Sequence, residues 1–217
     1  QHGRPRMGAT VELNVGDLLA RAWEVFKSNA GAFLGAALVC LLIYGLTHLV
    51  LSQVHQTLAT LGMILIGGPL QLGLNKMALA GARGQRVNFA TLFDGFNNPV
   101  NAILANLLIS VFTLIGFACV VVPGVLIYTL YCTTFLFMVD GTTDFWGAME
   151  NSRKFTSENY LQWLLVAVVA IVLMAAGLAL CAVGAVVTAP LAMLLIAFAY
   201  ERQRTSGRLP EEPVVLP

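Results

Sequence analysis

Three side-chain amides stand out because they interrupt long apolar stretches. Gln71 and Asn75 lie one helical turn apart in one stretch, and Asn106 lies in the next. Amides donate and accept hydrogen bonds without carrying charge. One interpretation is that the three meet in a polar pocket within the membrane and bind a lipid or another small amphiphile. The other is that they only link helices, through hydrogen bonds that contribute about 0.6 to 2 kcal/mol each in membranes.

Other residue types that could do chemistry are present, but their spacing does not assemble a catalytic or metal site. The chain has no GxSxG, HExxH or phosphate-loop motif. His48 and His55 flank a short polar link without a third metal ligand. Asp140 and Asp144 lie at a helix start, where carboxylates serve as caps. We therefore expect a protein that is not an enzyme, with no catalytic residue, metal or cofactor.

The four cysteines all lie in apolar stretches and form no CxxC pair: Cys40, Cys119, Cys132 and Cys181. We expect them to be small packing residues; a disulfide between Cys119 and Cys181 is the alternative. Asp, Glu and Arg are missing from the predicted spans, where only His48 and Lys76 can carry charge. Because proton-coupled pumps use charged groups deep in the membrane, this pattern argues against a pump.

The composition is that of an integral membrane protein. Of 217 residues, 58% are hydrophobic and only 11% are charged, and the mean hydropathy is +0.81. Soluble domains carry about 25% charged residues and could not bury so much apolar surface. The net charge is only +1, so we expect no nucleic-acid partner.

Six apolar stretches are long enough to cross the membrane as helices, at about 1.5 Å per residue. They comprise residues 30–52, 58–80, 101–121, 125–139, 160–182 and 185–200. Residues 122–124 and 183–184 are predicted turns, and the Gly-Gly-Pro sequence at 67–69 is expected to kink the second span. The six-span domain is predicted at 14–203, between a flexible segment (1–13) and a disordered tail (204–217).

A polar segment with apolar residues at helical spacing precedes each pair of spans, near residues 15–28, 89–96 and 145–155. We predict that these segments are amphipathic helices in the membrane interface. The predicted fold class is therefore all-α and integral to the membrane. It has six transmembrane helices in three hairpins, each preceded by an amphipathic helix.

The basic residues lie at one end of the predicted spans. All 12 Lys and Arg fall in the terminal segments, in the links after the second and fourth spans, or at the end of the second span. The positive-inside rule then places both termini in the cytoplasm. Six residues form an aromatic and cationic girdle on that side: Trp23, Arg83, Arg86, Trp146, Arg153 and Lys154. The girdle either anchors the protein at the interface, which we favour, or recognises anionic headgroups at about 1 kcal/mol per basic residue.

Four segments carry a family resemblance: VGDLLARAWEVFKSNAGAFLG, ARGQRVNFATLFDGF, VPGVLIYTLYCTTFLFMVDG and FWGAMENSRKFTSENYLQWL. In order and spacing they resemble the six-helix bacterial membrane domain that is fused to some glycerophosphodiester phosphodiesterases, and its stand-alone relatives. The resemblance covers roughly residues 14–203 and implies a six-span fold in the bacterial cytoplasmic membrane. It implies no catalytic residue, because the phosphodiesterase domain has no counterpart in these 217 residues.

Two functions fit these observations. The first is a non-enzymatic scaffold or accessory subunit of a membrane complex, with membrane lipids and other subunits as partners. It is suggested by the lack of charged and catalytic groups in the spans. The alternative is a lipid or small-amphiphile transport or binding module that uses Gln71, Asn75 and Asn106. An intramembrane enzyme has the least support, because no nucleophile and base can be paired.

Overall fold

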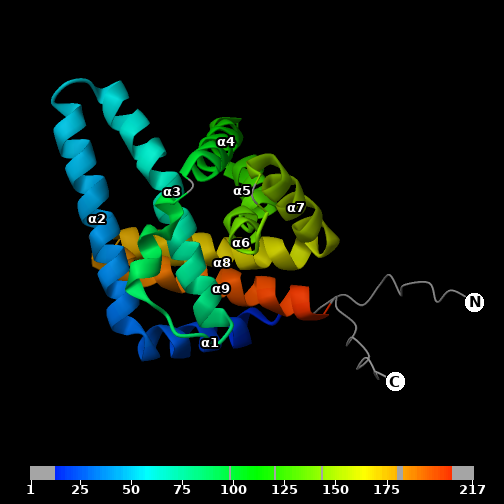
Figure 1. Cartoon of the computed structure of the whole chain (residues 1–217). Helices are drawn as coiled ribbons and strands as arrows, with labels where there is room; N and C mark the ends of the chain where they lie inside the picture. The colour runs from blue at the N-terminus through cyan, green and yellow to red at the C-terminus, as the bar shows by residue number, and fades with distance from the viewer. Residues whose placement is uncertain (1–12, 98, 120, 143, 180–182, 207–217) are drawn as a thin grey trace, which may run out of the picture.

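A computed structural model describes residues 13–97, 99–119, 121–142, 144–179 and 183–206, and each regular element in these ranges is a helix (Figure 1). Six of the helical segments are long and apolar enough to cross a membrane. They are α2 (Ala30–Ser52), α3 (Gln56–Ala82), α4 (Pro99–Cys119), the pair α5 (Val121–Tyr131) and α6 (Thr134–Val139), α8 (Tyr160–Ala179) and α9 (Val183–Ser206). The other elements are α1 (Val15–Ser28), η1 (Phe89–Phe96) and α7 (Phe145–Glu158). The prediction of an all-helical chain with six candidate spans is confirmed.

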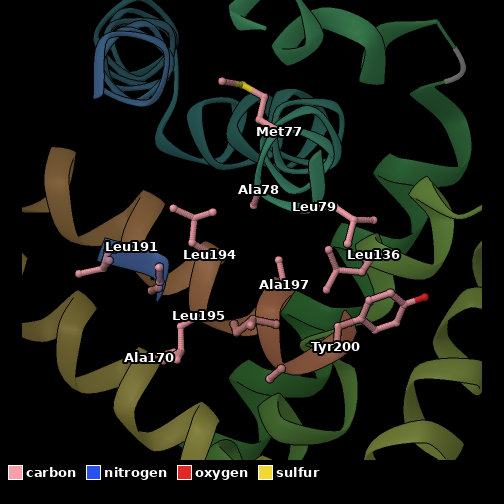
Figure 2. Close-up of a cluster of buried hydrophobic side chains, with 14 of the residues drawn as sticks. Met77, Ala78, Leu79, Leu136, Ala170, Leu191, Leu194, Leu195, Ala197 and Tyr200 are labelled. Atoms are coloured by element: carbon pink, nitrogen blue, oxygen red, sulfur yellow. The ribbon is translucent and has the colours of Figure 1, made fainter. Parts of the chain in front are cut away.

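Helices α3 and α9 form the centre of the molecule. In Figure 2, Ala78 of α3 points toward Leu194 and Ala197 of α9, while Leu79 lies beside Leu136 of α6. All of these side chains are buried. We compared the most apolar 18-residue stretch of each helix. Of its residues, 56% are buried in α9 but only 11% in α2. Helix α2 therefore lies at the periphery, where its exposed leucines, such as Leu42, would face lipid.

Glycines let α3 approach its neighbours closely. A methyl group at Gly73 would overlap the backbone carbonyl of Leu92 in η1, and one at Gly68 would overlap backbone atoms of α4. From the other side, a methyl group at Gly95 of η1 would overlap the carbonyl of Pro69. Small residues at helix contacts are the usual means of close packing in membranes, where van der Waals contact drives association.

The segment η1 differs from the predicted α-helix because it is a 3-10 helix. A 3-10 helix has three residues per turn, so residues three apart share a face. Leu92 and Gly95 are accordingly its buried residues, while its three phenylalanines stay more than a third exposed. Asn88 caps the start of η1, since its side chain accepts a hydrogen bond from the backbone N–H of Ala90.

The fourth predicted span is not one helix but breaks at residues 132–133, between α5 and α6. At the break, the hydroxyl of Ser152 in α7 donates to the carbonyl of Leu130 at 2.8 Å. The same hydroxyl lies 2.8 Å from the hydroxyl of Thr133. Broken helices are tolerated in membranes where neighbouring groups satisfy the freed backbone. The buried Ser152 thus joins α7 to the broken span.

Helix α9 continues to Ser206, so the predicted boundary at residue 203 falls inside it. The side chain of Gln203 explains the extension, because it accepts a hydrogen bond from the indole of Trp163 at 2.6 Å. It also donates to the carbonyl of Phe155 at 2.8 Å. Polar residues that looked like the start of a tail therefore belong to the packed end of α9.

Two other boundaries differ from the prediction. Residues 122–124, a predicted turn, lie in the first turn of α5, where proline is tolerated. Residues 183–184 likewise begin α9. Helix α3 runs through Pro69 without interruption, so the Gly-Gly-Pro sequence lies within one continuous helix.

Candidate functional site

The three amides singled out in the sequence lie on the wall of one cavity of about 170 Å³. Gln71 and Asn75 reach it from α3, and Asn106 reaches it from α4. The rest of the wall comes from α4, α5, α6, α8 and α9 and from the break between α5 and α6. We call this space the amide cavity. Its other lining residues are Ile109, Tyr128, Tyr131, Cys132, Phe135, Met174, Ala189, Ala192, Met193 and Ile196.

The hydrogen bonds of the amides leave acceptors free in the cavity. The side chain of Asn75 donates to the backbone carbonyl of Gln71 at 2.8 Å, and that of Asn106 donates to the backbone carbonyl of Ile64 at 3.2 Å. Both bonds use the amide nitrogen. Four side-chain atoms have no hydrogen-bond partner among the described residues. They are the amide oxygens of Asn75 and Asn106 and the amide oxygen and nitrogen of Gln71. The amides therefore support helix packing and still offer groups to a ligand.

A second cavity of about 220 Å³ adjoins the first, and we call it the apolar cavity. Four residues line both cavities: Gln71, Met174, Ala189 and Met193. The apolar cavity is otherwise lined by Ala37, Cys40, Leu41, Tyr44, Leu74, Ala185, Val186 and Pro190. The side chains that separate the two spaces include two methionines, which repack easily because they are unbranched. Together the cavities exceed the roughly 300 Å³ at which small-molecule sites begin.

Neither cavity is lined by a charged side chain among the described residues. Polarity in the amide cavity comes instead from amides, two tyrosine hydroxyls and one thiol. A site of this kind can orient a ligand by hydrogen bonding, but it offers no charge to balance an ionic group. In the described residues, no group of three His, Cys, Asp or Glu could hold a metal ion.

Four charges at the predicted cytoplasmic end form a network that the sequence did not indicate. Arg83, which follows α3, contacts Asp140 at 2.7 Å and Glu201 at 2.5 Å. Arg204 contacts the same two carboxylates at 3.0 and 3.3 Å. The hydroxyl of Tyr200 donates to Asp140 at 2.8 Å. These contacts tie the ends of α3, α6 and α9 together.

The network is partly buried and carries no net charge. Asp140 is 12% exposed and Arg83 is 25% exposed. Burial alone would lower the pKa of Arg83, but hydrogen bonds to Glu201 and Asp140 raise it above its ordinary value. Arg83 therefore stays charged and links the ends of three helices, while its role as an interfacial anchor stays a prediction. Of the two predicted caps, Asp144 does cap α7, whereas Asp140 ends α6.

The other predicted anchors lie on the surface. Trp23 is 43% exposed and Trp146 is 59% exposed, and Arg86 is exposed as well. Arg153 and Lys154 are exposed, but both pair with Glu150, at 2.7 and 3.2 Å. Hydrogen bonds from these two residues lower the pKa of Glu150 to about 2. Their charge is thus partly balanced within α7.

Two of the four cysteines line the cavities, and the structure does not describe the side chains of the other two. Cys40 lines the apolar cavity and Cys132 lines the amide cavity, and both are free thiols. The alternative of a disulfide between Cys119 and Cys181 concerns side chains outside the described part of the structure. Sequence reasoning also missed Tyr128 and Tyr131, whose place on the cavity wall depends on how α5 packs.

Comparison of the chain with known protein families, with curated proteins and with solved structures finds no match.

Proposed function

We propose that this protein binds small amphiphiles of the membrane, without catalysis, as a lipid-binding or transport module. One observation carries the proposal: a cavity with three amides lies back to back with an apolar cavity, and Gln71 lines both. A lipid has the same division into a polar and an apolar part. Had each amide bonded fully to a different helix, no polar group would remain for a ligand to contact.

A variant that fills the apolar cavity tests this proposal. Ala37 lines that cavity, and Ala37→Leu adds three carbons there. Ala176→Leu makes the same change on an exposed face of α8. Native mass spectrometry of protein released from nanodiscs should show an amphiphile retained by the wild type and by Ala176→Leu, and lost from Ala37→Leu. Equal retention by all three proteins would refute the proposal.

We propose that the protein lies in the bacterial cytoplasmic membrane with both termini in the cytoplasm. The support is charge placement: the basic residues sit at the ends of the spans that meet the ion network. In this arrangement α1, η1 and α7 lie near the interface and precede three hairpins. An impermeant maleimide should label Val54→Cys in intact cells, but Gln85→Cys only after permeabilisation. Labelling in the reverse pattern would overturn the topology.

We keep the relationship to the six-helix domain of some glycerophosphodiester phosphodiesterases as a proposal. Its support is the four sequence segments and the agreement in the number of candidate spans. A close relative in which these segments are joined to a phosphodiesterase domain would strengthen it.

A second candidate function is that of an accessory subunit. It is favoured by a polar groove of about 390 Å³ between α1 and α9, lined by Asp17, Leu18, Arg21, Ala82, Phe198, Glu201, Arg202 and Thr205. The groove offers both signs of charge to a partner segment. Co-purification in mild detergent of a partner that is lost in Arg21→Glu would support this function. A lone protein in each detergent tried would count against it.

A further inference from the structure

We infer that the ligand is an uncharged, single-chain amphiphile whose polar head occupies the amide cavity and whose chain occupies the apolar cavity. The inference rests on the proposed function and specifies the chemical class of the ligand. It predicts selection by headgroup charge and a fixed direction of binding. Monoacylglycerols fit this description and serve as the probe.

The lack of charge in the lining excludes ionic headgroups. Each described side chain that lines the two cavities is neutral. A phosphate or an ammonium group placed there would lose its hydration without gaining a counter-charge, which is costly in an apolar setting. Hydroxyl and ester groups can instead bond to the free atoms of Gln71, Asn75 and Asn106. The chemistry of the amide cavity therefore matches a glycerol ester.

The position of the two cavities fixes the direction of the ligand. Ala185 lines only the apolar cavity and Ala192 lines only the amide cavity. These residues are two turns apart on α9, which is about 10 Å, and Ala192 is nearer to the end that carries the ion network. The amide cavity is therefore nearer to the proposed cytoplasmic side. A lipid of the inner leaflet enters with the same orientation, head toward the cytoplasm.

The size of the cavities favours one chain. The apolar cavity, at about 220 Å³, is less than the 300 Å³ at which drug-sized sites begin. One chain can enter and pass Met174 and Met193, which repack with little cost.

Three probes with a 12-carbon chain test the inference in nanodiscs by native mass spectrometry. They are monolauroylglycerol, lauroyl lysophosphatidic acid, which adds only a phosphate, and dodecyltrimethylammonium. We expect monolauroylglycerol to bind at least about tenfold more tightly than either charged probe. Gln71→Leu should weaken its binding about 3- to 30-fold, the contribution of one hydrogen bond in a membrane. Gln85→Leu, on the exposed link, should leave binding unchanged.

A variant that changes the preferred probe, rather than abolishing binding, distinguishes a specific effect from misfolding. Gln71→Glu places a carboxyl group between the cavities, and a bound cationic headgroup favours its ionised form, so dodecyltrimethylammonium should become the preferred probe. Equal or tighter binding of lysophosphatidic acid by the wild type would overturn the neutral-head inference but leave amphiphile binding intact. Failure of Gln71→Glu to change the preference would also overturn it. If no probe binds, or if Ala37→Leu does not alter binding of any probe, the proposed function itself fails.

Discussion

Replacing Arg83 by methionine should destabilise the protein substantially, although the residue lies at a helix end. The change keeps the aliphatic part of the side chain but removes the guanidinium. Asp140 and Glu201 then share a single cation, Arg204, and the network carries a net negative charge. The end of α3 also loses its charged link to α6 and α9.

The magnitude follows from the burial of the network. Removing one partner of a fully buried ion pair costs about 3 to 5 kcal/mol. Here the carboxylates are 12% and 17% exposed and Arg83 is 25% exposed, so water screens part of the remaining charge. We expect a loss of about 2 to 3 kcal/mol in the free energy of unfolding. For a protein of this size that is a decrease in Tm of about 4 to 12 °C.

Thermal unfolding in mild detergent, followed by tryptophan fluorescence, measures the effect. Arg86→Met is the matched control, because Arg86 is exposed and forms no ion pair in the described structure. We expect its Tm to stay within about 2 °C of the wild type. Arg83→Lys should recover only part of the loss, since an ammonium cannot present the planar fork of donors that serves two carboxylates.

A double-mutant cycle with Asp140→Asn separates the pairwise interaction from other effects of the substitution. We expect a coupling energy of about 1 to 2 kcal/mol between Arg83 and Asp140. If Arg83→Met and Arg86→Met unfold at the same temperature, or if the coupling energy is zero, the network does not hold the helix ends together.

Three further predictions concern packing, the broken helix and pH. Gly73→Ala should destabilise by about 1 to 3 kcal/mol because its methyl group overlaps backbone, whereas Gly45→Ala, in open space, should not lower Tm. Ser152→Ala should cost about 1 to 3 kcal/mol by removing a donor at a buried break, and the exposed Ser157→Ala should cost under about 0.5 kcal/mol; equal Tm values for the two would contradict this. The lowered pKa of Glu150, about 2 against 4.5, implies stabilisation that is complete above pH 4.5 and lost as pH falls toward 2, so Tm measured across this range should fall less in Glu150→Gln than in the wild type.

Periodicity and composition were sufficient to predict the membrane class, because long apolar stretches have few alternatives to helices that cross a bilayer. The amides were identified for a related reason. A polar side chain within a span is rare enough to be noticed in one sequence, and the shared cavity of Gln71, Asn75 and Asn106 follows from their similar depth. Their depth alone could not reveal the apolar cavity, which depends on how α2 packs against α9.

Details set by tertiary contacts could not be read from the sequence. The break after α5 depends on a hydroxyl of α7, Ser152, which lies about twenty residues further along the chain. The extension of α9 depends in the same way on Trp163 and Gln203. Basic residues near a span usually lie at the interface, so the sequence predicts that position for Arg83 but not its ion pairs. Its partners come from distant helix ends, and only the folded chain brings them together.

Photocrosslinking with two monolauroylglycerol probes tests the central claim most directly. One probe carries its diazirine on the glycerol and the other carries it at the end of the chain. We predict that the glycerol probe labels peptides that contain Asn106 and Tyr128, and that the chain-end probe labels α2 near Ala37 and Tyr44. Both patterns should disappear with excess unlabelled monolauroylglycerol. If the two probes label the same exposed residues, such as Leu42 and Leu46, and excess ligand does not compete, the protein has no amphiphile site between these helices.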